Sequence, residues 1–405
     1  MKKLIWLGCL SYFVIGLATV IFGTLMSNLL HDYGRNFSDG GSIVFAQFGG
    51  FLAGVLFAPR CVRSLGYRRG IWLAFAGLFA AHAILFLQPY WYVLFIPATL
   101  NGFCFGLAQT AIGTLLLEAS DKNKAVTMSR LEVAFGVGAL LMPAISSLFL
   151  KNNSGFGPFA IVASCACLMM MIWIFSYTDY AKKAGNEGAE PDTSAAKHST
   201  TNIIKFYPLA FLMCFVFLYV GLETSTINFL PSVFESRLHF ESSQATLTVS
   251  IFWISMIIGR IFSGVIAEQI GYFKFLLISS SGALISLIGL AFFENAWIVF
   301  ALVFAAGLFL SGIFAIAVVH ANNANPESTK QTTSIIIASG GIGGALLPLL
   351  VGWSMDAVQP GAATWLLAGF AVLMILFLLQ VRTVPSAKVR RHKIVENDIN
   401  ISGRQ

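Results

Sequence analysis

The chain has 405 residues, of which 57% are hydrophobic and only 11% are charged, and its formal net charge is +7. Soluble globular domains carry roughly 25% charged residues, so this composition excludes an ordinary soluble protein and indicates a membrane protein. The apolar runs are long enough to cross about 30 Å of hydrocarbon as helices, and they lack the two-residue alternation of a transmembrane β-barrel. We therefore expect an all-α protein in contact with the lipid bilayer.

Twelve apolar runs follow one another along the chain, and each predicts one transmembrane helix. We place these helices at residues 4–30, 41–62, 70–89, 92–118, 129–150, 158–178, 206–232, 244–267, 274–293, 296–319, 332–354 and 362–381. A polar stretch between the sixth and seventh runs predicts a linker. The resulting organisation is an N-terminal six-helix half at 1–178, a linker at 179–205, a C-terminal six-helix half at 206–381 and a tail at 382–405.

Basic residues are concentrated at one end of these helices. Of the 25 Lys and Arg residues, only Arg35, Lys151 and Arg237 fall in loops at the other end. Because cytoplasmic loops carry the excess of basic residues, we expect both termini, the linker and the tail to be cytoplasmic, in a protein of the cytoplasmic membrane. The basic residues are scattered over many loops, so nucleic acid is not an expected partner.

The chain repeats itself at a fixed offset of 205 residues. Four matches share this offset: Gly16-Leu17 with Gly221-Leu222, Gly66-Tyr67 with Gly271-Tyr272, Gly102 with Gly307, and Gly138–Pro143 with Gly343–Pro348. Two similar halves of six membrane helices are the layout of a major facilitator transporter. Such a transporter moves a small solute by rocking its halves around a site near the bilayer midplane.

The sequence contains no enzyme motif. It has no P-loop, so ATP is not an expected energy source. The six cysteines lie in or at the edges of apolar runs, and this position predicts neither a disulfide framework nor a metal site. We expect a monomeric transporter without enzyme activity, cofactor or metal, driven by the proton gradient.

Two short loops at the expected cytoplasmic face have related sequences. Gly54–Gly70 joins the second predicted helix to the third, and Gly259–Gly271 joins the eighth to the ninth. Both resemble the signature between the second and third helices of the major facilitator superfamily, although its usual Asp is missing from the first loop. Glu268 stands near the place of that Asp in the second loop, where it can pair with Arg260. We favour a structural latch without substrate contact, and its candidate residues are Arg60, Arg130, Arg260 and Glu268.

Two acids lie within predicted membrane helices, where a charge is costly and is usually functional or paired. Glu223 lies in the seventh helix, and its repeat mate is Ala18, so the symmetry of the fold does not require an acid there. It is either a coupling group in a cavity or a carboxylate near the outer surface that bonds to hydroxyls. Glu132, in the fifth helix, either binds a substrate group or joins a cytoplasmic gate, and we favour the gate. Both are candidates for carrying a proton, because burial without a partner favours the protonated carboxyl.

Uncharged polar and aromatic side chains also fall on helices that line a central cavity in this architecture. Polar groups that orient a ligand between aromatic faces suit a sugar or a similar polar solute, although helix packing is the favoured interpretation of each group taken alone. The substrate-binding candidates are Gln109, Asn28, Gln47, Asn101, Tyr219, Asn228 and Trp253.

Several of these stretches carry a more specific resemblance. The runs Met128–Leu140, Phe217–Ser232, Phe252–Ile261 and Ala338–Ala345 resemble the glucose/mannose–proton symporters of bacilli, in the fucose-permease branch of the superfamily. The resemblance covers nearly the whole chain, and it implies sugar uptake by proton symport.

One departure from that branch affects the coupling mechanism. Its symporters carry a Leu-Glu-Thr run in the fourth helix whose acid is implicated in proton coupling, and here Gln109 replaces that acid. Fucose permeases also have an acid in the first helix, and none occurs here between Leu4 and Leu30. Proton coupling must then use Glu223 or Glu132. The alternative functions are export of a drug-like or siderophore-like compound by proton antiport, and a sensor or scaffold without transport.

Overall fold

The computed structural model describes residues 2–119, 124–152, 155–175, 203–324 and 329–382, and every regular element in these ranges is helical. The elements are α1 (Lys2–Tyr33), α2 (Phe37–Phe86), the short 3-10 helix η1 (Trp91–Leu94), α3 (Phe95–Ala119), α4 (Lys124–Lys151), α5 (Gly157–Phe175), α7 (Ile203–Leu238), α8 (Ser242–Ile270), α9 (Tyr272–Phe292), α10 (Ala296–Leu310), α11 (Ile313–Ala324), α12 (Thr329–Ala357) and α13 (Ala362–Arg382). The predicted linker at 179–205 and the tail at 382–405 lie almost wholly outside the described residues.

Among the described residues, eleven helical segments are long and apolar enough to cross a membrane, and one of them contains two predicted spans. That segment is α2, whose 50 residues are interrupted by Gly66 at a φ of 78°. Its repeat mate Gly271 has a φ of 91° and separates α8 from α9. A side chain is disfavoured at such positive φ values, so the repeated Gly-Tyr pairs mark the same turn in the two halves.

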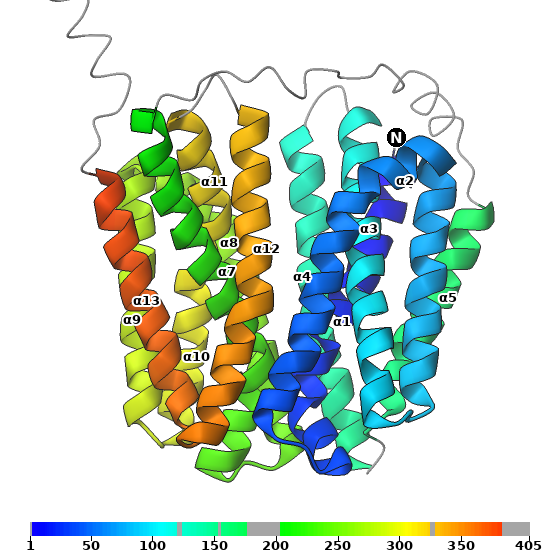
Figure 1. Ribbon diagram of the computed structural model, residues 1–405, viewed down its shortest axis with the longest axis horizontal. Coiled ribbons are helices and arrows are strands. Elements are labelled where there is room, and N and C mark those ends of the chain that lie inside the picture. Colours follow the sequence, from blue (N-terminus) through cyan, green and yellow to red (C-terminus); the bar gives the residue numbers. More distant parts are fainter. Residues whose placement is uncertain (1, 120–123, 153–154, 176–202, 325–328, 383–405) are drawn as a thin grey trace, which may run out of the picture.

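The helices form two groups that stand side by side in Figure 1, α1–α5 in one group and α7–α13 in the other. Contacts between the groups run from α1 to α7, from α2 to α12 and from α4 to α8. The beginning of α1 and the end of α13 lie at the same end of the bundle (Figure 1), which we call the terminal end. The other end is called the distal end.

Close helix packing repeats with the same offset as the sequence. Two glycine contacts recur with both partners shifted by 205 residues, Gly102 on Gln47 with Gly307 on Phe252, and Gly54 on Phe103 with Gly259 on Leu308. In each contact a Cβ on the glycine would crowd the carbonyl oxygen of the facing residue. Small residues are enriched where membrane helices approach this closely, so the repeated glycines preserve helix contacts rather than a binding motif.

The tenth predicted span, at 296–319, is one candidate membrane span in the structure, Ala296–Ala324, with a short turn inside it. Helix α10 ends at Leu310, and α11 begins at Ile313 after a turn at Ser311 and Gly312. The carbonyl of Leu310 accepts a hydrogen bond from the hydroxyl of Tyr219 in α7. A break of this kind is tolerated within a membrane helix when neighbouring helices satisfy the freed backbone groups.

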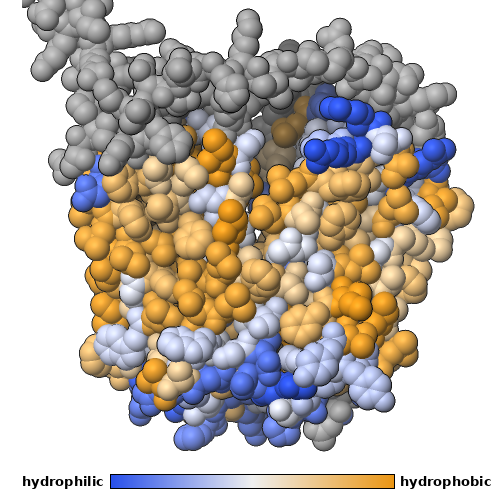
Figure 2. Space-filling view, viewed as in Figure 1, coloured by the Kyte–Doolittle hydropathy of each residue, from blue (hydrophilic) through white to orange (hydrophobic). Residues whose placement is uncertain are grey.

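The molecular surface in Figure 2 carries a broad hydrophobic band around its middle, with hydrophilic residues at the distal end and at part of the terminal end. Exposed Tyr90, Tyr92 and Trp297 lie at the distal edge of this band. Tyr and Trp are enriched where a membrane meets water, and the band is the surface expected of a protein surrounded by lipid.

Candidate functional site

A three-residue ionic cluster lies where the two groups of helices meet. Arg260 of α8 places Nη2 3.5 Å from Oε1 of Glu223 in α7 and Nη1 3.7 Å from Oε2 of Glu132 in α4. One guanidinium therefore faces two carboxylates, one from its own half and one from the other. The two acids that the sequence singled out are brought together by this arginine.

An aromatic contact extends the cluster across the same boundary. The guanidinium carbon of Arg260 lies 5.6 Å from the ring centre of Trp253, two helical turns earlier in α8. The Trp253 ring in turn meets Phe135 of α4 at 5.7 Å, nearly edge to face. The indole N–H of Trp253 is buried and has no hydrogen-bond partner among the described residues. A buried donor without a partner is costly, so this N–H is suited to bind a polar ligand.

Tyr219 supports Glu223 from within the same helix. The two residues are one helical turn apart in α7, on the same face of the helix. The Tyr219 hydroxyl donates to the carbonyl of Leu310 at 3.0 Å, at the turn between α10 and α11. Tyr219 therefore joins the face of α7 that carries Glu223 to the tenth span.

Solvent access differs among the three charged side chains. Glu223 is 15% exposed, Arg260 is 31% exposed and Glu132 is 43% exposed. Glu132 lies eight residues from the start of α4, and Arg260 ten residues from the end of α8. At 1.5 Å per residue, the cluster is about 12–15 Å from the terminal end.

The two halves are hydrogen-bonded to each other nearer the distal end. Ser27 of α1 donates to Glu235 of α7, and the hydroxyl of Thr246 in α8 donates to the carbonyl of Thr24 at 3.1 Å. Ser147 of α4 donates to the carbonyl of Ser243 at the start of α8 at 2.8 Å. These bonds join the two halves on the distal side of the ionic cluster.

Two predicted substrate-binding amides are used in helix packing. Gln47 donates to the carbonyl of Thr19 at 3.0 Å, and Asn101 donates to the carbonyl of Ala18 at 3.1 Å. Ala18 is the repeat mate of Glu223, so these amides occupy the corresponding level of the N-terminal half. The side-chain amide oxygens of Gln47 and Asn101 are buried and have no hydrogen-bond partner among the described residues.

The remaining polar candidates lie at different depths. Asn28 donates to Asp32 near the distal end of α1, and the buried Asn228 donates to the carbonyl of Thr224 in its own helix. Gln109 is partly buried, and its backbone carbonyl accepts from the hydroxyl of Tyr12 at 2.9 Å. This bond holds the backbone of Gln109 against α1 and involves no atom of its side-chain amide.

The predicted latch residues are not assembled into one group. Arg260 contacts Glu132 and Glu223, whereas Glu268, its expected partner, is exposed two turns further along α8. The difference arises because Arg260 lies inside the helix bundle and Glu268 faces its surface. Arg60 and Arg130 are exposed as well. The sequence analysis did not identify Glu235 or Asp356. Glu235 accepts from Ser27 and Asp356 from Phe37, in the other half. These contacts form only because particular helix ends meet at the distal end, which the sequence does not reveal.

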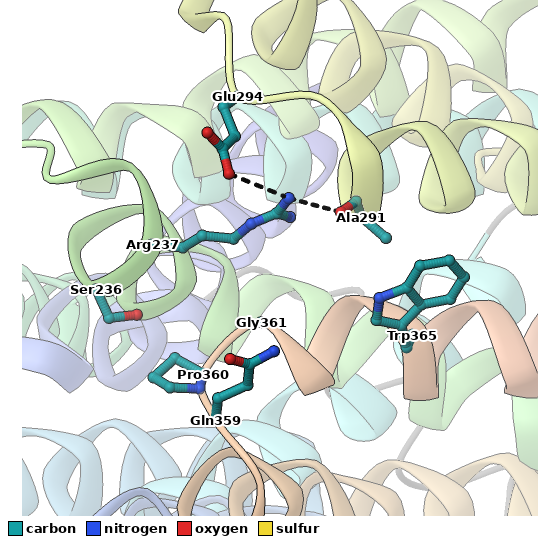
Figure 3. Close-up of a pocket in the computed structure, with 8 residues that line it drawn as sticks. All are labelled: Ser236, Arg237, Ala291, Glu294, Gln359, Pro360, Gly361 and Trp365. Carbon is teal, nitrogen blue, oxygen red and sulfur yellow. Dashed lines mark hydrogen bonds and ion pairs between the residues drawn. The ribbon is translucent and has the colours of Figure 1, made fainter.

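A separate pocket of about 350 Å³ lies at the distal end of the C-terminal half. In Figure 3 the side chain of Arg237 extends toward Glu294 and the carbonyl of Ala291. Arg237 donates to Ala291 at 2.6 Å and to Leu290 at 2.7 Å, and it lies 3.9 Å from the Glu294 carboxylate. A cation at the carbonyl end of α9 complements the helix dipole, so Arg237 has a structural role there. The pocket lies within one half and is distinct from the ionic cluster between the halves.

Comparison with known proteins agrees with this architecture. The family model described as the Major Facilitator Superfamily matches residues 8–323 and 212–397. The chain is 32% identical to the glucose/mannose transporter GlcP of Bacillus subtilis (strain 168) over 401 residues, which cover 98% of this chain and 97% of that protein. It is 22% identical to the sodium-dependent glucose transporter 1A of Mus musculus over 381 residues, which cover 84% of this chain and 87% of the relative.

A solved structure shows the same fold. The crystal structure of a D-xylose-proton symporter aligns with a TM-score of 0.74 at 18% identity, covering 94% of this chain and 97% of that one. The all-α fold and the family predicted from the 205-residue repeat are thereby confirmed, as is the expectation that the protein is a transporter and not an enzyme. The chain belongs to the Major Facilitator Superfamily of membrane transporters.

Proposed function

We propose that this protein takes up a small sugar, a hexose such as glucose or mannose, by proton symport across the cytoplasmic membrane. The observation that carries the proposal is the cluster in which Arg260 faces Glu223 and Glu132 between the two halves. The similarity to the glucose/mannose transporter GlcP over nearly the full length supports the substrate class. The D-xylose-proton symporter supports proton coupling only by analogy, as a protein that carries out this reaction on the same fold.

Transport follows from movement of the two halves against each other around the cluster. The contacts α1–α7, α2–α12 and α4–α8 form the boundary that must rearrange. Hydrogen bonds join the halves on the distal side of the cluster, so we infer that the cluster is reached from the terminal end. If the terminal end is cytoplasmic, as the basic residues predict, this is an inward-facing arrangement of a transporter that acts as a monomer.

Glu223 is the proposed proton carrier. It is the least exposed of the three charged residues, and its carboxylate lies 3.5 Å from the Arg260 guanidinium. A carboxylate that must be neutralised within a membrane span can be stabilised either by Arg260 or by a proton, and exchange between the two is the basis of coupling. Glu132 is the second candidate, because it shares the same arginine.

The cluster also offers groups that suit a hydroxylated solute. Sugar hydroxyls donate to carboxylates and accept from N–H groups, and the apolar faces of sugars pack on aromatic rings. In the part of the chain that the structure describes, the buried Trp253 indole N–H has no acceptor, and Gln109 carries an amide that both donates and accepts. We propose these two as substrate contacts, together with Tyr219.

The test is uptake into proteoliposomes that contain the purified protein. We expect radiolabelled glucose or mannose to accumulate when the outside is made more acidic than the inside, and the accumulation to be abolished by a protonophore. Accumulation of hexose driven by a sodium gradient at equal pH would support sodium coupling in place of proton coupling. Failure to transport any hexose under either gradient would overturn the proposal.

Export by proton antiport, the second function considered from the sequence, has its own readout. Cells that lack the gene would retain more of a toxic dye or siderophore and would take up hexose normally. That result would support export as the function and would contradict hexose uptake.

A further inference from the structure

We propose that the pocket at the distal end of the C-terminal half is a second binding site, which holds a neutral saccharide away from the ionic cluster. Its volume of about 350 Å³ lies at the small end of the range of roughly 300–1,000 Å³ that is usual for ligand pockets. Every residue that lines it belongs to the C-terminal half, so binding there does not depend on the proposed transport activity.

Three segments of the chain meet at this distal pocket. Arg237 lies at the end of α7, and Glu294 lies in the connection between α9 and α10. Gln359 and Gly361 belong to the turn between α12 and α13, and Trp365 lies in the first turn of α13. Because these segments move together when one half rocks against the other, the pocket keeps its shape during such a movement.

The walls of the distal pocket are held in place by contacts of their own. Arg237 donates to two backbone carbonyls at the end of α9, at 2.6 and 2.7 Å. The hydroxyl of Thr364 donates to the carbonyl of Gly361 at 2.8 Å and fixes the turn before α13. The ring of Trp365 meets Phe292 edge to face at 5.1 Å. Since these side chains are already ordered, a ligand pays little conformational entropy for binding between them.

Gly361 leaves the centre of the distal pocket open. A Cβ added there would lie 3.6 Å from Cδ of Arg237 and 3.9 Å from Nε2 of Gln359, which are ordinary contact distances. A side chain at this position would therefore point between two of the lining residues. The φ angle of Gly361 lies outside the left-handed range, so the backbone does not require a glycine.

The repeat shows that the fold does not require a hollow at this place. The residue of the N-terminal half that corresponds to Gly361 at the offset of 205 is Phe156. The Phe156 ring packs on Tyr33 at 6.2 Å and on Phe159 at 6.1 Å, so an aromatic cluster surrounds this position in the N-terminal half. Trp365 likewise corresponds to Ala160. The C-terminal half has thus lost a ring at the centre of the site and gained one at its wall.

The charges in the distal pocket favour a neutral ligand. The Arg237 guanidinium lies 3.9 Å from the Glu294 carboxylate, so the site contains one cation and one anion. An ion of either sign would be attracted by one of these groups and repelled by the other. A neutral polar molecule can instead form hydrogen bonds with both.

The remaining groups match the chemistry of a sugar. In Figure 3 the amide of Gln359 and the ring of Trp365 lie on opposite sides of one space, with the Arg237 guanidinium facing it. The amide donates and accepts hydrogen bonds, and the Glu294 carboxylate accepts them from hydroxyls. The Trp365 ring is 49% exposed and offers an apolar face to the C–H groups of a sugar ring. A single saccharide ring carries both kinds of surface.

The test is ¹⁹F NMR of the full-length protein in detergent, with 5-fluorotryptophan in place of its eight tryptophans. The variants Trp365→Phe and Trp253→Phe identify the resonance of the distal pocket and that of the ionic cluster. Glucose and mannose are the ligands, and glycerol at equal concentration is the control for a solvent effect. We expect the Trp365 resonance to shift with either hexose until it saturates, and to change little with glycerol.

The decisive variant is Gly361→Phe, which gives the C-terminal half the residue of the N-terminal half. Its ring should fill the pocket and abolish the response of the Trp365 resonance to hexose. The matched control is Gly369→Phe, one turn after Trp365 in α13, where no atom lies within 4 Å of an added Cβ. It should keep the response. Gln359→Ala is a milder change, and it should weaken the affinity read from the Trp365 resonance by about 2- to 13-fold, the effect of one lost hydrogen bond.

The two tryptophan resonances separate this site from the proposed transport site. A Trp365 resonance that does not respond to hexose, or that responds equally to glycerol, would overturn the distal saccharide site even if the Trp253 resonance responds. A response that persists in Gly361→Phe would place the bound sugar elsewhere and would contradict the proposal as well. If Gly361→Phe does not fold, an unchanged affinity in Gln359→Ala would have the same meaning. A saturable response at Trp365 with none at Trp253 would support the distal site and would count against Trp253 as a substrate contact.

Discussion

Asp356 at the end of α12 accepts two hydrogen bonds from Ser38 at the start of α2, one from the backbone N–H at 2.6 Å and one from the hydroxyl at 2.5 Å. The other carboxylate oxygen accepts from the backbone N–H of Phe37 at 2.9 Å. The first N–H groups of a helix have no partner within the helix, and its N-terminus favours an anion. An acid from one half therefore caps a helix of the other half at the distal end.

Replacing Asp356 with Ala should loosen distal closure. Loss of an N-terminal cap costs about 0.5–2 kcal/mol, and here that energy favours the closed distal end over the open one. We expect a single cysteine placed at Asn28, in a cysteine-free background, to react faster with an impermeant maleimide added at the distal side. Ser38→Ala is the matched control, since it removes one hydroxyl and keeps both backbone bonds, and it should have a smaller effect. Equal labelling rates in wild type and Asp356→Ala would show that the other distal bonds are sufficient.

Glu223→Gln should keep expression and folding but abolish gradient-driven transport. The amide retains nearly the shape of the acid and cannot exchange a proton, so substrate-substrate exchange should be less affected than accumulation. Both rates are measured in the same proteoliposomes with radiolabelled hexose. A normal accumulation level in this variant would remove Glu223 from coupling and would direct attention to Glu132.

Gly54→Ala should destabilise the protein because α2 and α3 touch there through their backbones. A Cβ at this position would overlap the carbonyl oxygen of Phe103. Overpacking typically costs about 1–3 kcal/mol when the helices must move apart. Gly49→Ala in the same helix is the control, since no atom lies within 4 Å of its added Cβ. The difference in stability between the two variants is measured by thermal unfolding in detergent, with size-exclusion chromatography as the readout. Equal stability of the two variants would contradict the packing argument.

The sequence predicts the helices well because membrane spans depend on local composition. Each predicted span has a helix in the structure, and the Gly66 and Gly271 turns fall where the repeat places them. Only the acids of the ionic cluster could be predicted from the sequence. An acid inside an apolar run is visible in the sequence as a costly group that needs a partner. Its partner is not visible, because Arg260 reaches Glu132 only after α4 and α8 meet across the halves.

The same reasoning explains the two buried amides of the N-terminal half. Gln47 and Asn101 resemble ligand-binding groups in the sequence, because both are polar residues within spans. In the structure they donate to two consecutive backbone carbonyls of α1. These contacts could be predicted only if it were known which face of α1, α2 and α3 points toward the other helices. Polar side chains in membrane helices serve packing and binding alike, and sequence position alone does not distinguish the two uses.

The orientation of the bundle is tested with two exposed positions at opposite ends. Ser64 lies at the terminal end, and Tyr90 lies at the distal end and is 87% exposed. Because basic residues concentrate at the terminal end, we expect it to be cytoplasmic. In intact cells an impermeant thiol reagent should label Tyr90→Cys and leave Ser64→Cys unlabelled until the membrane is opened. The reverse pattern would invert the topology and, with it, the assignment of this structure as inward-facing.

Gln109 should bind substrate without taking part in coupling. It replaces the acid of the symporter branch with a neutral amide, which costs less to hold in a membrane span and exchanges no proton. Its helix α3 packs against α1 and α4, and its side chain is partly buried. Gln109→Ala should weaken apparent affinity by about 0.5–1.5 kcal/mol, the net value of one hydrogen bond.

The substitution Gln109→Glu tests the same assignment from the opposite direction. It places a carboxyl in a membrane span where the wild type has a neutral amide, so transport should acquire a new dependence on pH as that carboxyl gains and loses its proton. Hexose exchange measured from about pH 5 to pH 8 gives the profile, since perturbed carboxyl groups titrate in this range. Gln109→Asn is the control, because it shortens the side chain while keeping it neutral, and it should weaken affinity without changing the shape of the profile. Unchanged affinity in Gln109→Ala together with an unchanged pH profile in Gln109→Glu would place the side chain against another helix and remove it from the substrate site.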